Sequence, residues 1–101
     1  MSLSQTEKKR LRTIGHRLKP IVTIAGKGLS ENVMAELERA LEDHELIKIK
    51  LVVGAKEQRQ AVIDELCNSC SAQLVQSLGN TALLFRAAAK PNPKLSNLIR
   101  V

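Results

Sequence analysis

The fold of this chain is decided by residues 19–30, which read KPIVTIAGKGLS. Residues 21–25 predict a short buried strand, the glycines and lysine after them predict an exposed loop, and Ser30 predicts the start of a helix. Glycines let a backbone come close to a ligand, and a helix N-terminus points free N–H groups at an anion. The stretch therefore predicts either a phosphate-binding loop or an ordinary connection between a strand and a helix.

The length and composition indicate one globular domain. The 101 residues are 44% hydrophobic and 26% charged, and no apolar run approaches the roughly 20 residues that span a bilayer. The N-terminal residues lack the apolar segment of a signal peptide. We therefore expect a cytoplasmic protein without a membrane partner.

Charge is distributed unevenly along the chain. Residues 1–30 hold seven Lys and Arg against one Glu, whereas residues 31–45 hold six Asp and Glu against one Arg. A basic surface beside one acidic helix favours docking of a polyanion on one side of the molecule. Phe85 is the only aromatic residue, so RNA bases would not be bound on an aromatic platform.

The remaining elements follow from capping and periodicity. Ser4 and Glu7 form a capping-box pattern, and the helix they open ends at Gly15. An amphipathic helix runs from Ser30 to about His44, and turn residues Gly79 and Asn80 join two strands. The expected elements are a helix to residue 14, a strand at 21–25, a helix at 30–44, a strand at 46–53, a helix at 56–69, and strands at 72–78 and 81–86.

This order, α-β-α-β-α-β-β, predicts an α/β fold of the α+β type. We expect a four-stranded sheet of mixed direction, with the second and third helices packed on one face. In the strand at 46–53, Lys48 and Lys50 alternate with apolar residues and should stand on the open face beside Leu46. The first helix has few apolar positions and should be only thinly attached.

Several residues with possible chemistry have simpler structural explanations. Cys67 and Cys70 form a CxxC pair, but at the end of a helix, where the dipole does not lower a thiol pKa, so we expect them to pack in the core. His16 could contact RNA or pack at a corner of the fold, and His44 is expected to be structural. We find no catalytic grouping or P-loop, and expect no enzyme activity, small-molecule substrate, cofactor or metal.

With these residues in place, the chain resembles the CRM-domain family (chloroplast RNA splicing and ribosome maturation) of the stand-alone bacterial YhbY type. The resemblance covers about residues 2–86. It is carried by Leu11 and by four runs: residues 15–22 (GHRLKPIV), 28–30 (GLS), 44–50 (HELIKIK) and 79–86 (GNTALLFR). The family's GxxG loop falls on residues 25–28, where Ala25 replaces the first glycine.

The resemblance implies a single RNA-binding domain at residues 1–86, similar in fold to the C-terminal domain of translation initiation factor three. It implies a non-enzymatic protein that acts on ribosomal RNA in precursors of the large ribosomal subunit. The alternative is a protein-interaction module whose acidic second helix docks a ribosomal protein. Expected RNA-binding residues are Lys8, Lys9, Arg12, His16, Arg17, Lys19, Gly26, Lys27, Gly28, Lys48, Lys50 and Arg86.

Two further expectations concern arrangement in space. We expect Lys19, Lys27 and the cations of the first helix to converge around the glycine loop, so that a polyanion can settle there. Residues 87–101, which contain Pro91 and Pro93, are expected to form a loosely ordered basic tail.

Overall fold

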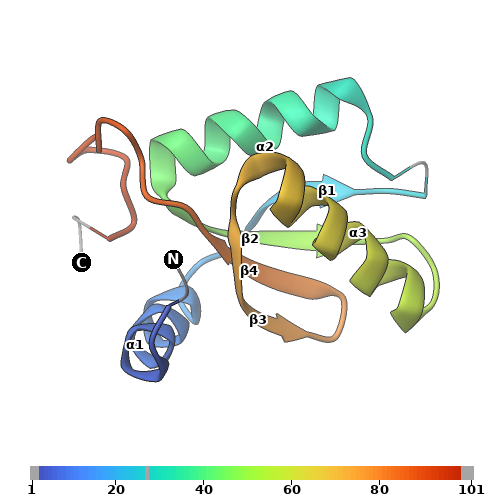
Figure 1. The fold of residues 1–101 in the computed structure, drawn as a ribbon, viewed down its shortest axis with the longest axis horizontal. Helices are drawn as coiled ribbons and strands as arrows, with labels where there is room; N and C mark the ends of the chain where they lie inside the picture. The colour runs from blue at the N-terminus through green and yellow to red at the C-terminus, as the bar shows by residue number, and fades with distance from the viewer. Residues whose placement is uncertain (1–2, 27, 99–101) are drawn as a thin grey trace.

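A computed structural model describes residues 3–26 and 28–98 of the chain (Figure 1). The elements agree with the sequence predictions to within two residues at each end. They are α1 (Gln5–Gly15), β1 (Pro20–Ile24), α2 (Glu31–His44), β2 (Leu46–Leu51), α3 (Lys56–Cys70), β3 (Gln73–Leu78) and β4 (Thr81–Phe85). α1 and α2 begin at the predicted caps Ser4 and Ser30, whereas Ala55 before α3 makes no side-chain cap.

The four strands form one mixed sheet in the order β1-β2-β4-β3. β1 runs parallel to β2, and β2 and β3 each run antiparallel to β4. The predicted four-stranded sheet of mixed direction is therefore confirmed. β1 lies at one edge of this sheet, with the glycine loop directly after it.

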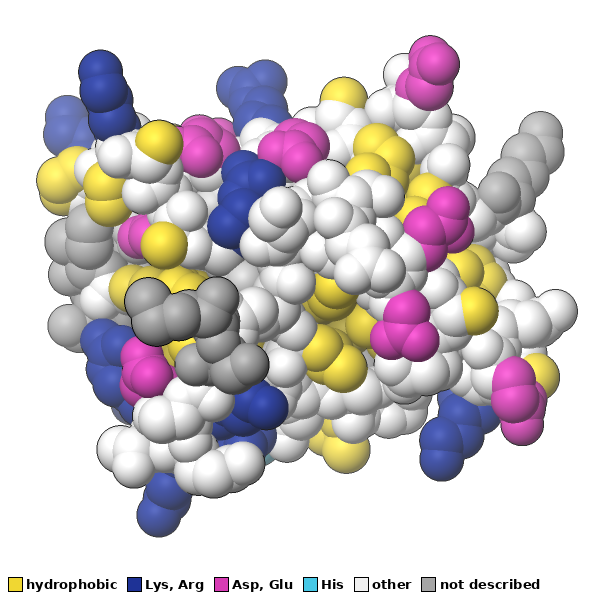
Figure 2. All heavy atoms as spheres, viewed as in Figure 1, with side chains coloured by type: hydrophobic (Ala, Val, Ile, Leu, Met, Phe, Trp, Pro, Cys, Tyr) yellow, Lys and Arg dark blue, Asp and Glu magenta, His cyan; other side chains and the backbone are white. Residues whose placement is uncertain are grey.

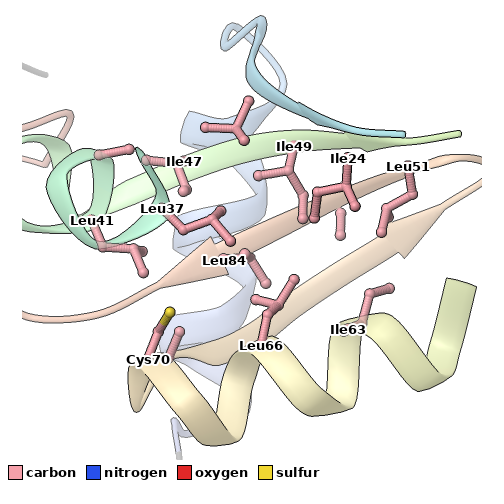
Figure 3. Close-up of a cluster of buried hydrophobic side chains, with 14 residues drawn as sticks. Ile24, Leu37, Leu41, Ile47, Ile49, Leu51, Ile63, Leu66, Cys70 and Leu84 are labelled. Atoms are coloured by element: carbon pink, nitrogen blue, oxygen red, sulfur yellow. The ribbon is translucent and has the colours of Figure 1, made fainter. Parts of the chain in front are cut away.

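The main core lies between the sheet and two helices. Leu37 and Leu41 of α2 and Ile63 and Leu66 of α3 are almost fully buried, and they point at the inward residues of the strands (Figure 3). Cys70 is part of the same cluster, as the sequence predicted. These contacts fix α2 and α3 on one face of the sheet.

α1 packs on the opposite face, which the sequence did not predict. Leu11 and Ile14 are buried against Leu46, Val75 and Leu83, and α1 lies behind the sheet in Figure 3. Leu46 was expected on an open face, but it has no exposed surface. Although α1 has few apolar residues, they meet apolar residues from three strands, so α1 is firmly attached.

Residues 87–98, which we call the C-terminal strap, lie against the junction of α2 and β2. The Glu45 carboxylate accepts hydrogen bonds from the Ala88 N–H at 2.9 Å and from the Ser96 hydroxyl at 2.7 Å. Ser96 is completely buried. The described part of the segment expected to be loosely ordered is thus held by specific hydrogen bonds.

None of the helices in the described parts of the chain combines the length and the apolar character needed to cross a membrane.

Candidate functional site

The glycine loop after β1 is an open turn. The Gly28 N–H donates to the Ala25 carbonyl at 2.9 Å, and Gly28 has a φ of +75°, which glycine adopts without strain. Apart from the chain neighbours of each glycine, no described residue has an atom within 4 Å of the place a side chain would take at Gly26 or Gly28. The backbone here is accessible to a phosphate. Lys27, the expected loop cation, lies outside the described residues.

The start of α2 adds unpaired donors beside this loop. The Ser30 hydroxyl accepts the Val33 N–H at 3.2 Å, whereas the N–H groups of Glu31 and Asn32 have no partner within the described chain. Such donors favour an anion. The exposed Glu31 side chain in the same turn offsets part of this attraction.

The cations expected to converge on the loop do not do so. Lys19 precedes β1 and the loop follows it, so the five residues of β1 separate them by roughly 16 Å at strand rise. α1 and the loop also lie toward opposite ends of the molecule in Figure 1. The prediction of convergence around one turn was wrong, because an extended strand carries the chain away from its starting point.

Two lysines of β2 lie beside β1, between Lys19 and the glycine loop. Lys48 pairs with Pro20 and Lys50 pairs with Thr23 in the parallel register. Both lysine side chains are on the sheet face opposite to α2 and α3, because the alternate residues Ile47 and Ile49 are in the main core. We call Arg17, Lys19, Lys48 and Lys50 the basic row. It begins in the α1–β1 connection, where Arg17 and Lys19 lie with Lys48 around one hollow, and it ends at Lys50, which pairs with Thr23 of β1.

The cations of α1 lie beside Leu11 and Ile14, the two side chains that pack on the sheet. Lys8 and Arg12 are half-buried beside Leu11, and Lys9 is exposed. His16 is the exposed C-cap residue of α1, and its backbone N–H donates to the Arg12 carbonyl at 3.0 Å. These residues belong to the same sheet face as the basic row, because α1 covers the neighbouring part of that face.

Arg86 is held apart from this surface. Its guanidinium contacts the Glu38 carboxylate at 2.6 Å and the Glu42 carboxylate at 3.5 Å, and it donates to the Cys70 carbonyl at 3.1 Å. Only 18% of its side chain is exposed. Arg86 therefore joins α2, α3 and the end of β4, and we leave it out of the candidate site.

The same contacts reduce the free acidic charge of α2. Arg86 contacts both Glu38 and Glu42 and offsets one of their two negative charges, and Arg39 lies 3.7 Å from Asp43. On the face drawn in Figure 2, Lys and Arg side chains stand apart from one another, with Asp and Glu side chains between several of them. This face thus carries a mixture of charges, which suits a solvated surface.

The cysteines do not form a reactive pair. Burial raises the pKa of the Cys67 thiol, and burial together with the neighbouring Glu38 carboxylate raises the pKa of Cys70 to about 11. A redox thiol needs the opposite shift. Among residues 3–26 and 28–98, no cluster of three His, Cys, Asp or Glu side chains could hold a metal ion.

Asn97 is a polar residue near the basic row that the sequence did not single out. Its side-chain N–H donates to the Leu46 carbonyl at 2.7 Å, and its backbone N–H donates to the His44 carbonyl at 3.0 Å. The segment containing it carries no helix or strand pattern. Only the folded chain brings it beside Lys48.

Comparisons with known proteins place the chain among sequences of one family. The CRS1 / YhbY (CRM) domain model matches residues 3–86. A probable RNA-binding protein of Pseudomonas aeruginosa is 52% identical over 100 residues, covering 99% of this chain and 96% of its own. An RNA-binding protein of Haemophilus influenzae is 36% identical, with coverage of 93% and 95%.

The fold also matches a solved structure. The solution structure of a hypothetical protein from Staphylococcus aureus superposes with a TM-score of 0.77 and 26% identity. The match covers 88% of this chain and 93% of that one.

Proposed function

The chain belongs to the CRS1 / YhbY (CRM) domain family, and on this premise we propose that it binds RNA through the basic row and the glycine loop. The observation that supports this most is the row itself. Arg17 and Lys19 lie just before the edge strand β1, and Lys48 and Lys50 lie beside it on β2. The strand leads to an exposed turn next to the free N–H groups at the start of α2. Phosphates are bound by such cations and donors without regard to base sequence.

Each group has a distinct role in this proposal. Arg17, Lys19, Lys48 and Lys50 neutralise successive phosphates along β1. Gly26 and Gly28 allow the RNA backbone to approach the turn, and Lys27 adds a cation there. Lys8, Lys9, Arg12 and His16 extend the positive field beside the row. The domain that does this comprises residues 1–86, and the protein acts without catalysis, a cofactor or a metal.

We further propose that the RNA is ribosomal and that the protein acts in the cytoplasm during assembly of the large ribosomal subunit. The resemblance of its motifs to the bacterial YhbY type supports this assignment. Crosslinking in cells, followed by sequencing of the attached RNA, tests it. Enrichment of precursor RNA of the large subunit is expected, whereas enrichment of messenger or transfer RNA would contradict the proposal.

Charge reversal tests the RNA surface itself. The variant Lys19→Glu with Lys48→Glu should lower affinity for a short single-stranded RNA about tenfold or more at moderate salt, because two phosphate contacts become repulsive. The matched control is Lys56→Glu with Lys90→Glu, which changes net charge equally at exposed lysines outside the row. Equal losses in both variants would contradict a localised site.

The alternative, docking of a ribosomal protein on α2, is less well supported. Three of the α2 carboxylates are already paired with Arg86 or Arg39. The test of this alternative is binding to a basic ribosomal protein. Docking on α2 would be favoured if this binding survives in Lys19→Glu with Lys48→Glu but is lost in Glu31→Gln with Glu36→Gln.

A further inference from the structure

A hollow of about 210 Å³ lies beside the basic row, between the α1–β1 connection, the end of α2 and the C-terminal strap. Its cations are Arg17, Lys19 and Lys48. Its apolar wall includes Leu18 and Ile21, and Ile21 is half-exposed at this edge of the sheet. The hollow therefore combines positive charge with an apolar surface.

Two polar side chains complete the lining, and hydrogen bonds hold both in place. His44 Nδ1 lies 2.8 Å from the Leu95 carbonyl, and Asn97 Nδ2 donates to the Leu46 carbonyl at 2.7 Å. A carbonyl oxygen can only accept, so the Asn97 amide nitrogen is the atom facing Leu46. This orientation leaves the amide oxygen and the second amide hydrogen of Asn97 without a partner among the described residues.

The free amide oxygen and second amide hydrogen of Asn97 give the lining of the hollow one acceptor and one donor. A side-chain amide of this kind complements adenine, which offers a donor and an acceptor side by side on its edge. Sequence-specific RNA recognition usually takes an unstacked base from a single strand and bonds its edge, often with an apolar or guanidinium surface against the base face. Leu18, Ile21 and Arg17 supply such surfaces here.

We propose that this hollow takes one unpaired adenine of the bound RNA, while Arg17, Lys19 and Lys48 hold the adjoining phosphates. The inference rests on the proposed function, and it adds base recognition to a surface that otherwise binds any RNA. The volume is below the roughly 300 Å³ at which pockets for drug-sized ligands begin, which suits a base rather than a larger molecule. The strap becomes part of the site because it supplies Asn97.

The test uses two single-stranded RNAs that differ at one position. One is a short oligouridine with a single central adenosine, and the other has a central cytidine in its place. Fluorescence anisotropy should show about tenfold tighter binding of the adenosine RNA, as a good amide–adenine pair provides. Asn97→Ala should bring the two affinities together, and the matched control Asn68→Ala, an exposed residue of α3, should keep the preference.

A second variant avoids any effect on the strap. Ile21→Trp fills the hollow from its exposed edge and should also abolish the preference for the adenosine RNA. Equal binding of both RNAs by the wild type, or a preference that survives both variants, would overturn the inference while leaving the proposed function intact. Failure of both RNAs to bind would instead contradict the proposed function.

Discussion

The guanidinium of Arg86 lies 2.6 Å from the carboxylate of Glu38 and so joins the end of β4 to α2. Arg86 is mostly covered and also donates to the Cys70 carbonyl. Replacing it by Gln removes charge-assisted hydrogen bonds at a partly exposed site, so the free energy of unfolding should fall by about 1–2 kcal/mol. Urea unfolding measures this loss.

The control for this variant is Arg39→Gln. Arg39 makes an exposed ion pair with Asp43. Arg39→Gln should therefore change the free energy of unfolding by less than about 0.5 kcal/mol. Affinity of Arg86→Gln for RNA should equal that of the wild type at a temperature where both are folded. Unchanged stability with weakened RNA binding would show that Arg86 contacts RNA after all.

The same pair gives stability a dependence on pH. The hydrogen bond from Arg86 holds the pKa of Glu38 below its ordinary value of 4.5. A carboxyl group whose pKa is lower in the folded chain stabilises the fold above its unfolded pKa, and this stabilisation is lost as the pH falls through the folded pKa. Glu38 is nearly half exposed, so its contribution should stay below about 1 kcal/mol.

Comparison with Glu38→Gln isolates this contribution. The wild type should be the more stable protein at neutral pH, and the difference in free energy of unfolding should shrink as the pH falls below about 4.5. Urea unfolding at a series of pH values measures it. A difference that is the same at every pH would mean that Glu38 is not stabilised by Arg86.

Gly15 allows α1 to approach the sheet closely. A Cβ atom at this position would lie 2.5 Å from Cδ2 of the buried Leu83 side chain. Gly15→Ala should therefore lower the free energy of unfolding by about 1–3 kcal/mol through overpacking, despite the better helix propensity of Ala. Gly26→Ala, where the space is open, is the control. The double variant Gly15→Ala with Leu83→Ala should lose less free energy of unfolding than the sum of the two single losses, because the second change removes the clash.

The strap depends on the hydrogen bond between Ser96 and Glu45. Ser96→Ala leaves a buried carboxylate oxygen without its hydroxyl partner, so the strap should detach more often. Limited proteolysis should then cut within residues 87–98 sooner than in the wild type, while the sheet and its helices stay intact. A cleavage rate equal to that of the wild type would show that other contacts hold the strap.

Local patterns in the sequence were enough to predict the elements and their order. The Ser4 and Ser30 caps, the alternation in β2 and the turn at Gly79 and Asn80 each act within a few residues. These patterns predicted the ends of the helices and strands to within two residues. The resemblance of the motifs to the CRM family predicted how these elements assemble. The family itself is confirmed by the match over residues 3–86.

Contacts between distant residues could not be predicted in this way. Arg86 is 48 positions from Glu38, and Ser96 is 51 positions from Glu45, so no local pattern shows that they pair. The same holds for α1, whose buried side chains Leu11 and Ile14 gain their partners only when three strands assemble. The spread of the basic site along β1 also follows from the sheet and not from sequence spacing.

The most direct test of the central claim is the salt dependence of RNA binding. If the basic row and the loop neutralise about five phosphates, the logarithm of the association constant should fall with the logarithm of salt concentration with a slope near −3.5. Replacing Lys19 and Lys48 together by Gln should make the slope less steep by about 1.4. A slope near zero, or one that the double replacement leaves unchanged, would contradict the account.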